Sequence, residues 1–289
     1  MSLVDILGLI FGIAAPGSVS VWLYRRWTRR TVVKRITDPT DRDLDRAFVL
    51  YEQLLPNPNV RDSSEEILRW LQEMREEQRQ RAGCAEFIDY LIIVKNESAV
   101  RSFFYADFHP ASGLLFVDYL VSCEPEATQA ICRYLKRELG RTLRECRGIV
   151  FESEAPAPGQ REDWRARFRL FQRLGEPLGI VLKRLDFPCR QPRLSLWDDS
   201  YTEQPQFLFY ARTRPPPLGD TVPKDEVAHI LDVFYNDWYG SSYTDEPEHD
   251  AQYRAYVRRL YESTVAVLPE DVPTLSRPLH RGSQGTAVE

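Results

Sequence analysis

Apolar positions recur along this chain with periods that assign most of it to strands and helices. Residues 31–36 are rich in β-branched side chains, which is typical of a strand. Apolar residues then recur at helical spacing over 44–55 and over 67–74, and Ser63 or Ser64 is placed to cap the second helix. Three apolar runs, 87–94, 99–108 and 114–122, follow with short turn sequences between them. Their close spacing predicts an antiparallel meander.

The second half of the chain alternates helical and extended patterns. A helix is predicted over 127–146, and the short apolar run 148–151 is typical of a strand at the centre of a sheet. A helix over 163–174 and strands at 180–185 and 206–211 follow, and two more helices are expected within 227–238 and 253–261. The order predicts a mixed α/β fold, with a mostly antiparallel sheet flanked by helices. The polar tail, 273–289, is expected to be disordered.

The first thirty residues differ in character from the rest. Residues 6–24 carry no charge, and a run of about nineteen such residues can just cross a hydrocarbon core. Four arginines follow within 25–30, which predicts a membrane anchor over 1–30 with the remaining chain at the cytoplasmic face. Pro16 and Gly17 weaken a span, so a helix that lies on the membrane, or is buried in the protein, stays open. A cleaved export signal fits less well, because its positive charge would come first.

Composition narrows the classes of function. The 289 residues are 43% hydrophobic, enough for a sizeable core, and the formal net charge of −5 argues against nucleic acid as a partner. Five cysteines form no CxxC pair and are odd in number, so we interpret them as reduced structural residues. Four scattered histidines offer no cysteine–histidine pairing and argue against a zinc site.

The element order and three short segments together resemble the GNAT superfamily of acyl-CoA-dependent N-acyltransferases. The segments are FVDYLV at 116–121, which runs almost directly into a helix, GIVFESE at 148–154, and LFQRLG at 170–175. The resemblance implies a GNAT-like domain over 31–213. Three segments lie outside this domain, namely an anchor over 1–30, a C-terminal helical extension over 214–272 and the tail.

In that family, the junction between the strand and the helix splays the sheet and receives acyl-CoA. The resemblance therefore implies that acetyl-CoA, or another acyl-CoA, is the co-substrate. The positions that it implies for binding are Leu120, Val121, Ser122, Thr128 and Gln129.

The chain departs from the family at two places in this region. The family's pyrophosphate loop is rich in glycine, whereas residues 123–129 contain none and add Glu124 and Glu126, whose charge would oppose a pyrophosphate. Phe171 stands where many members have a tyrosine that protonates the departing thiolate, so Tyr134 or Tyr119 would have to serve, or the thiolate would leave unassisted.

An amine acceptor must lose a proton before or during its attack on a thioester, so a carboxylate is expected nearby. Glu152 is the first candidate for this base and Asp118 the second. Glu154 shares a strand face with Glu152 if the strand continues. The alternative is that these acids are merely solvated, or paired with arginines such as Arg147 or Arg165.

Two functions follow as hypotheses. The first is an acyl-CoA-dependent N-acyltransferase that acts at the cytoplasmic face of a membrane on an unknown amine, either a small molecule or a protein. The second is a non-catalytic GNAT-like domain that binds a partner at the membrane.

Overall fold

A computed structural model describes residues 31–56, 61–80, 87–97, 99–155, 174–193, 196–197, 202–240 and 247–275. They divide into two compact units. The first unit ends at Glu152 and also takes in Pro177–Ile180 and Arg212–Pro215, and the second contains the remainder. The division falls within one strand.

The first unit is built on a sheet whose strands follow the order β1-β3-β4-β5-β6. Their bounds are β1 Thr31–Ile36, β3 Leu91–Asn96, β4 Ala99–His109, β5 Leu114–Ser122 and β6 Gly148–Glu154, and the short β2, Ile88–Asp89, pairs with β4. Neighbouring strands from β1 to β5 are antiparallel, which confirms the predicted meander. The exception is β6, which pairs in parallel with β5.

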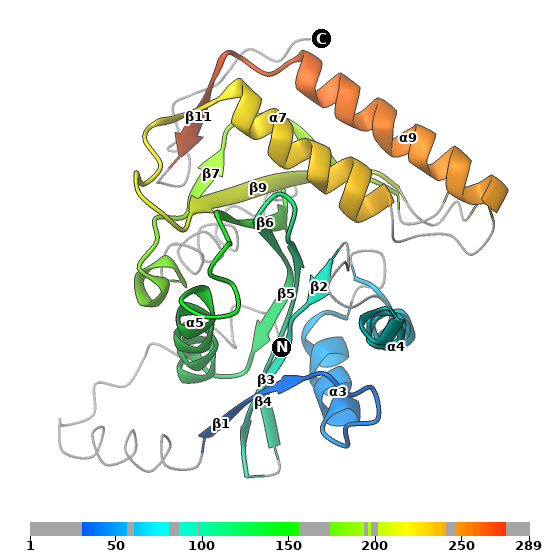
Figure 1. The fold of residues 1–289 in the computed structure, drawn as a ribbon, viewed down its shortest axis with the longest axis vertical. Coiled ribbons are helices and arrows are strands. Elements are labelled where there is room, and N and C mark those ends of the chain that lie inside the picture. Colours follow the sequence, from blue (N-terminus) through cyan, green and yellow to red (C-terminus); the bar gives the residue numbers. More distant parts are fainter. Residues whose placement is uncertain are drawn as a thin grey trace. The chain divides into compact units, whose positions relative to one another are not determined.

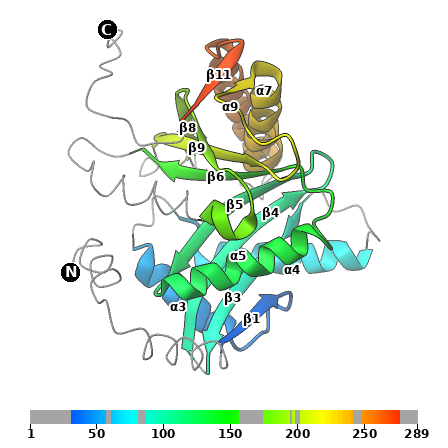
Figure 2. The same cartoon turned by 90° about the vertical axis from the view of Figure 1, so that its left-hand side faces the viewer.

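Helices cover both faces of this sheet (Figure 1). α3, Leu44–Leu54, and α4, Ser64–Gln80, lie on one face, and α5, Pro125–Leu139, crosses the other (Figure 2). Aromatic rings fill the layer beneath α3, where the ring centroids of Tyr51 and Phe103 are 4.9 Å apart. Tyr51, Phe103 and Tyr105 are all at most 1% exposed. Burial of each such side chain contributes about 1.5–3 kcal/mol, which fixes α3 on the sheet.

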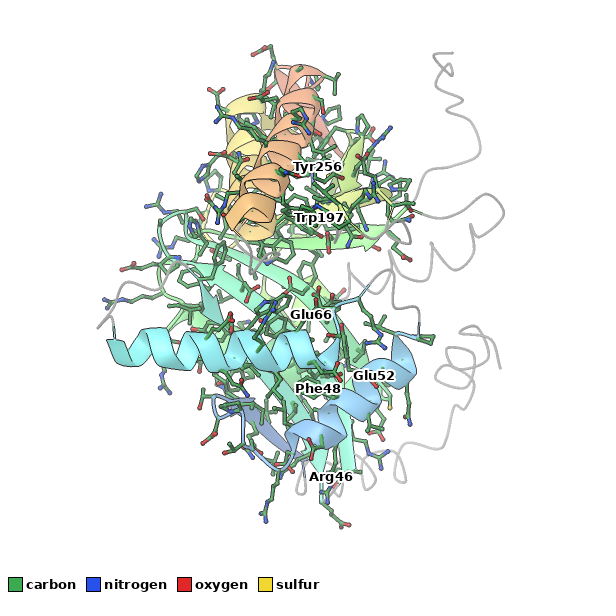
Figure 3. All side chains as sticks on the ribbon, turned by 90° about the vertical axis from the view of Figure 1, so that its right-hand side faces the viewer. Arg46, Phe48, Glu52, Glu66, Trp197 and Tyr256 are labelled. Carbon is green, nitrogen blue, oxygen red and sulfur yellow. The ribbon has the colours of Figure 1, made fainter. Side chains whose placement is uncertain are left out.

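The start of α4 is held by reciprocal capping hydrogen bonds. The Ser63 N–H donates to Glu66 Oε2 at 2.7 Å, and the Glu66 N–H donates to Ser63 Oγ at 3.1 Å, so Ser63 is the capping serine. Ser64 Oγ also donates to Glu52 Oε1 of α3 at 2.6 Å. Figure 3 shows Glu52 and Glu66 on this side of the sheet. These bonds anchor the end of the α3–α4 connection, which carries Asp62.

The second unit joins a small antiparallel sheet to a pair of helices. β9 pairs with β7 and β8, β7 with β11, and β11 with β10. The bounds are β7 Lys183–Leu185, β8 Cys189–Gln191, β9 Gln204–Arg212, β10 Thr221–Pro223, α7 Lys224–Asp232, η2 Val233–Tyr239, α9 Pro247–Ala266 and β11 Asp271–Leu275. The expected C-terminal helices are present, and α7 continues as the π-helical segment η2, which contacts α9.

Several expectations differ from the structure. The helix expected to reach residue 146 ends at Leu139, where the Gly140 N–H bonds the carbonyl of Arg137. Disorder expected from residue 273 is wrong for residues 273–275, which belong to β11. This strand alternates exposed and buried positions and pairs with β7 and β10. The strand is therefore stabilised by β7 and β10, and the local sequence of β11 gives no information about these partners.

Three expectations fall outside the described residues, namely the anchor over 1–30, most of the helix over 163–174 and the tail from 276. In the part of the chain that the structure describes, no helix combines the length and the apolar character that crossing a bilayer requires.

Candidate functional site

The neighbouring strands β5 and β6 pair along only part of their length. Four pairs join them, from Leu114 with Gly148 to Val117 with Phe151. β5 continues to Ser122 and β6 to Glu154, but the described residues show no further pair between them. A strand rises about 3.3 Å per residue, so roughly 17 Å of β5 beyond Val117 lacks a strand partner on this edge. Backbone groups on an unpaired edge can hydrogen-bond an extended ligand.

A β-bulge lies where the pairing ends. On β4, Tyr105 pairs with Tyr119 and Ala106 pairs with Val117, so Asp118 is the extra residue on β5. A bulge bends its strand and changes the direction of a side chain, and bulges are over-represented next to active sites. The bulge therefore supplies a local cause for the departure of β5 from β6.

Asp118 has an unusual environment at this bulge. The residue as a whole is partly exposed, but both carboxyl oxygens are buried and neither has a hydrogen-bond partner in the described structure. Burial, followed by the charges of Asp107 and Asp62, raises the pKa of Asp118 well above its usual range. Glu152 and Asp89 contribute in the same direction. Burial and the surrounding negative charge therefore favour the protonated form of Asp118.

Other acidic residues gather around Asp118. Asp89 on β2 lies opposite Asp107 on β4, and burial and the neighbouring Asp107 raise the pKa of Asp89 well above its usual range. Glu152 follows Phe151, the residue opposite Val117 at the last β5–β6 pair. Asp62 comes from the α3–α4 connection. Four segments of the chain therefore bring carboxyl groups to one region of the first unit, where a cation would be stabilised.

Asp62 is held in place by two tyrosines. The Tyr119 hydroxyl donates to Asp62 Oδ2 at 2.8 Å and accepts the Asp62 N–H at 2.9 Å. Tyr51 donates to the Asp62 carbonyl at 3.1 Å. Because Tyr119 already gives its proton to Asp62, it is poorly suited to the alternative role of protonating a thiolate. Tyr134 lies on α5, the helix on the opposite face of the sheet, and Phe171 is outside the described residues.

The residues proposed to hold acyl-CoA fall into two groups. Leu120 and Ser122 are partly exposed, whereas Val121 is buried against the α3 side of the core and its carbonyl accepts the Ser102 hydroxyl at 2.7 Å. Ser122 Oγ donates to the Glu124 carbonyl at 2.7 Å. These three residues all lie on the stretch of β5 that pairs with β4 but not with β6. Any contact from Val121 would have to use its backbone.

The other two proposed residues lie in the first turns of α5. Gln129 is exposed, but Thr128 is buried and its N–H bonds the Glu124 carbonyl at 3.4 Å. Glu124 is the N-cap and makes no side-chain cap bond. Its carboxylate instead lies 3.5 Å from the Arg101 guanidinium, so part of the negative charge expected to oppose a pyrophosphate is compensated.

The two acids on β6 have different surroundings. Strand β6 continues to Glu154, as the expectation of a shared face requires. Glu152 closes the first unit and is partly exposed, whereas Glu154 belongs to the second unit. The structure therefore brings together Glu152 and Asp118. Arg147, considered as an ion-pair partner for these acids, forms no ion pair within the described residues.

The described cysteines have the character of structural residues. Cys132, Cys146 and Cys189 are buried free thiols, and burial raises the pKa of Cys132 and of Cys146 to about 12. A thiol with such a pKa is a poor nucleophile at neutral pH. Cys84 lies outside the described residues.

Asp62, Asp89 and Asp107 were not among the predicted site residues. They are separated along the chain, and each stands in an unremarkable local sequence. The alternation of β4, which puts Asp107 on the face of Phe103 and Tyr105, was the signal that could have suggested one of them.

No family model and no curated protein matches the sequence. Several solved acetyltransferases are similar in structure. A GNAT-family protein from Desulfovibrio desulfuricans is 13% identical, with 64% of this chain and 99% of that chain covered and a TM-score of 0.38.

Two further structures are similar to the same extent. An N-acetyltransferase from Staphylococcus aureus is 10% identical, over 64% of this chain and 99% of that chain, with a TM-score of 0.40. The aminoglycoside 6′-N-acetyltransferase from Enterococcus faecium is 16% identical, over 65% and 99%, with a TM-score of 0.37. At such scores, neither substrate nor activity follows from the similarity.

Proposed function

We propose that this protein is an acyl-CoA-dependent N-acyltransferase with a cationic amine as its acceptor. The observation that carries the proposal is the departure of β5 from β6 after Val117 and Phe151, at the bulge of Asp118. The unpaired edge of β5 offers backbone donors and acceptors to the amide groups of a pantetheine arm, in the manner of an added strand. It leads to the N-terminus of α5, where the helix dipole favours phosphate. Pro125 has no N–H there, and the N–H groups of Ala127 and Thr128 bond the Glu124 carbonyl.

Glu152 is the proposed general base. It is partly exposed at the end of the β5–β6 pairing, whereas the oxygens of Asp118 are buried, so an amine that arrives from solvent meets Glu152 first. The ammonium gives a proton to the Glu152 carboxylate, and the neutral amine attacks the thioester carbonyl. The nitrogen of the tetrahedral intermediate carries one proton more than the amide product. The carbon–sulfur bond breaks to give the amide, and the departing CoA thiolate takes that proton.

The surrounding carboxyl groups favour an acceptor that carries positive charge. Asp62 and Asp107 contribute to the field that raises the pKa of Asp118, and the same field attracts an ammonium. A diamine or polyamine would gain from this field twice, because one ammonium can remain charged while the other reacts. We therefore place amines with two or more charges ahead of neutral or acidic acceptors.

The test starts with calorimetric titration of the full chain with acetyl-CoA and with a longer acyl-CoA. Release of CoA thiol is then followed with monoamines, diamines and amino acids. Glu152→Gln is expected to lower kcat by about 10²–10⁴-fold with acetyl-CoA binding retained. Glu65→Gln, on an exposed position of α4, is the matched control and is expected to change nothing. Absence of acyl-CoA binding at millimolar ligand would overturn the proposal.

The second candidate is a non-catalytic domain of the same architecture. The observation in its favour is the start of α5, where Glu124 occupies the N-cap and pairs with Arg101 in place of a glycine-rich loop. This reading predicts that no amine stimulates release of CoA, and that Glu152→Gln leaves the biological activity of the protein intact. The anchor over 1–30 and the cytoplasmic orientation belong to both candidates as predictions.

A further inference from the structure

A pocket of about 580 Å³ lies in the first unit at the turn between β4 and β5. Three arginines line it, Arg144, Arg147 and Arg214. The carboxylate of Glu145 and the turn residue Gly113 complete the part of the lining discussed below. None of these residues takes part in the site proposed above.

The fold brings the arginines together from two distant segments. Arg144 and Arg147 precede β6, whereas Arg214 follows β9, and a guanidinium nitrogen of Arg214 donates to the Arg144 carbonyl. The segment of Arg214 is fixed by its neighbour, because the Thr213 N–H donates to the Arg147 carbonyl at 3.0 Å and Thr213 Oγ1 donates to the Cys146 carbonyl at 2.6 Å. The pocket is therefore held by hydrogen bonds that Thr213 and Arg214 donate to backbone carbonyls.

Gly113 sets the position of the Arg147 side chain. Its φ is +72°, and the Arg147 N–H donates to its carbonyl at 2.6 Å. A Cβ at this glycine would lie 3.1 Å from Cγ of Arg147 and 2.7 Å from the Glu145 carbonyl oxygen. The stem of Arg147 thus passes directly over a position that only glycine leaves open.

The lining of the pocket carries more positive than negative charge. Within the described residues, none of the three arginines forms an ion pair, and Glu145 is the one acidic residue in the lining. Three guanidinium groups in one concavity repel each other, which is the more unusual in a chain whose net charge is −5. Arginine guanidinium groups bind phosphate oxygens in a bidentate manner, and a pocket of this volume is of the size that holds small molecules.

The pocket is distinct from the unpaired edge of β5. It lies at the turn that precedes Leu114, whereas the edge begins after Val117 and ends at Ser122. At about 3.3 Å per residue, roughly 13 Å of β5 separates Leu114 from Asp118, where the edge begins. A ligand in the pocket would therefore leave the edge free.

We propose that this arginine pocket binds a phosphate-bearing anion with more than one negative charge. Free diphosphate compounds and the headgroups of anionic phospholipids share this chemistry. The binding depends on the three guanidinium groups together, and it weakens as salt rises because their side chains are exposed.

The test is calorimetric titration of the full-length protein with inorganic pyrophosphate, beside flotation with phosphatidylcholine vesicles that contain or lack phosphatidic acid. Arg144→Ala and Arg147→Ala are each expected to weaken binding about tenfold. Arg133→Ala, at an exposed position of α5, is the matched control and is expected to leave binding unchanged. Thermal unfolding of each variant checks that the fold is intact, and acetyl-CoA affinity should be the same in all of them.

The outcomes separate the two sources of phosphate. Binding of pyrophosphate that the arginine variants lose supports a free ligand, and flotation with phosphatidic acid that the same variants lose supports a lipid headgroup. No binding of pyrophosphate or vesicles by the wild-type protein would overturn the proposal. Binding that survives both arginine variants but is displaced by CoA would overturn it as well, because the phosphate would then occupy the acyl-CoA site.

Discussion

Replacement of Asp118 by asparagine is expected to stabilise the protein at neutral pH. The carboxyl oxygens of Asp118 are buried without a hydrogen-bond partner in the described structure, and burial and the nearby carboxylates raise its pKa well above 3.8. In the unfolded chain the group ionises near pH 4. Between that pH and its raised pKa, the folded state keeps a proton that the unfolded state has lost, so ionisation favours unfolding.

The magnitude follows from proton linkage. One proton retained by the folded state lowers the free energy of unfolding by about 1.4 kcal/mol per pH unit over this window. Asparagine resembles the neutral carboxyl but does not titrate, so the variant lacks this fall in the free energy of unfolding with pH. Allowing for relaxation around the site, Asp118→Asn should gain about 1–3 kcal/mol at pH 7 and nothing at pH 4. For a chain of this size, that is a rise in Tm of roughly 2–10 °C.

The assay is thermal and urea unfolding of both proteins at a series of pH values from 4 to 8. Asp45→Asn, at an exposed position in the first turn of α3, is the control and should change the free energy of unfolding by at most a few tenths of a kcal/mol. A variant that is less stable than the wild type at pH 7, or a difference that does not grow with pH, would refute the reasoning.

The same variant also separates the two candidate bases. If Glu152 takes the proton, Asp118→Asn keeps most of the acyltransferase activity, because asparagine resembles the protonated form that burial favours at Asp118. Loss of activity in a stabilised Asp118→Asn variant would move the role of base from Glu152 to Asp118.

Three further predictions concern stability and substrate binding. Hydrogen bonds from two lysines lower the pKa of Asp43 from 3.8 to about 2. The ionised carboxylate therefore contributes about 1 kcal/mol to the free energy of unfolding, after solvent screening of the partly exposed lysines, and this contribution is present above pH 4 and lost as pH falls through 2. Chemical unfolding of Asp43→Asn across pH should show no such loss. Tyr119→Phe removes the two bonds to Asp62, which should cost about 1–2 kcal/mol and raise KM for the amine more than it lowers kcat, as steady-state kinetics would show. Gly113→Ala should destabilise by at least about 1 kcal/mol in urea unfolding, because its φ is +72°, whereas Gly140→Ala, whose φ is −88°, should have a smaller effect.

Local sequence determined most of the elements. The bounds of β1 and β5 agree with the runs 31–36 and 114–122, because β-branched and apolar residues there are bounded by turn sequences. The meander followed from short connections. The short strands β8, β10 and β11 gave no comparable signal, since segments of three to five residues are stabilised by the strands that they pair with.

The sites depended on tertiary structure. The sequence identified Asp118 and Glu152 as candidates, but only the register of β5 against β4 makes Asp118 the bulged residue, and only the end of the β5–β6 pairing brings Glu152 to the same place. Arg147 and Arg214 come from segments far apart along the chain and meet through backbone hydrogen bonds. Local periodicity reports which face of an element is apolar, whereas the neighbours of each face are set by strand register and packing.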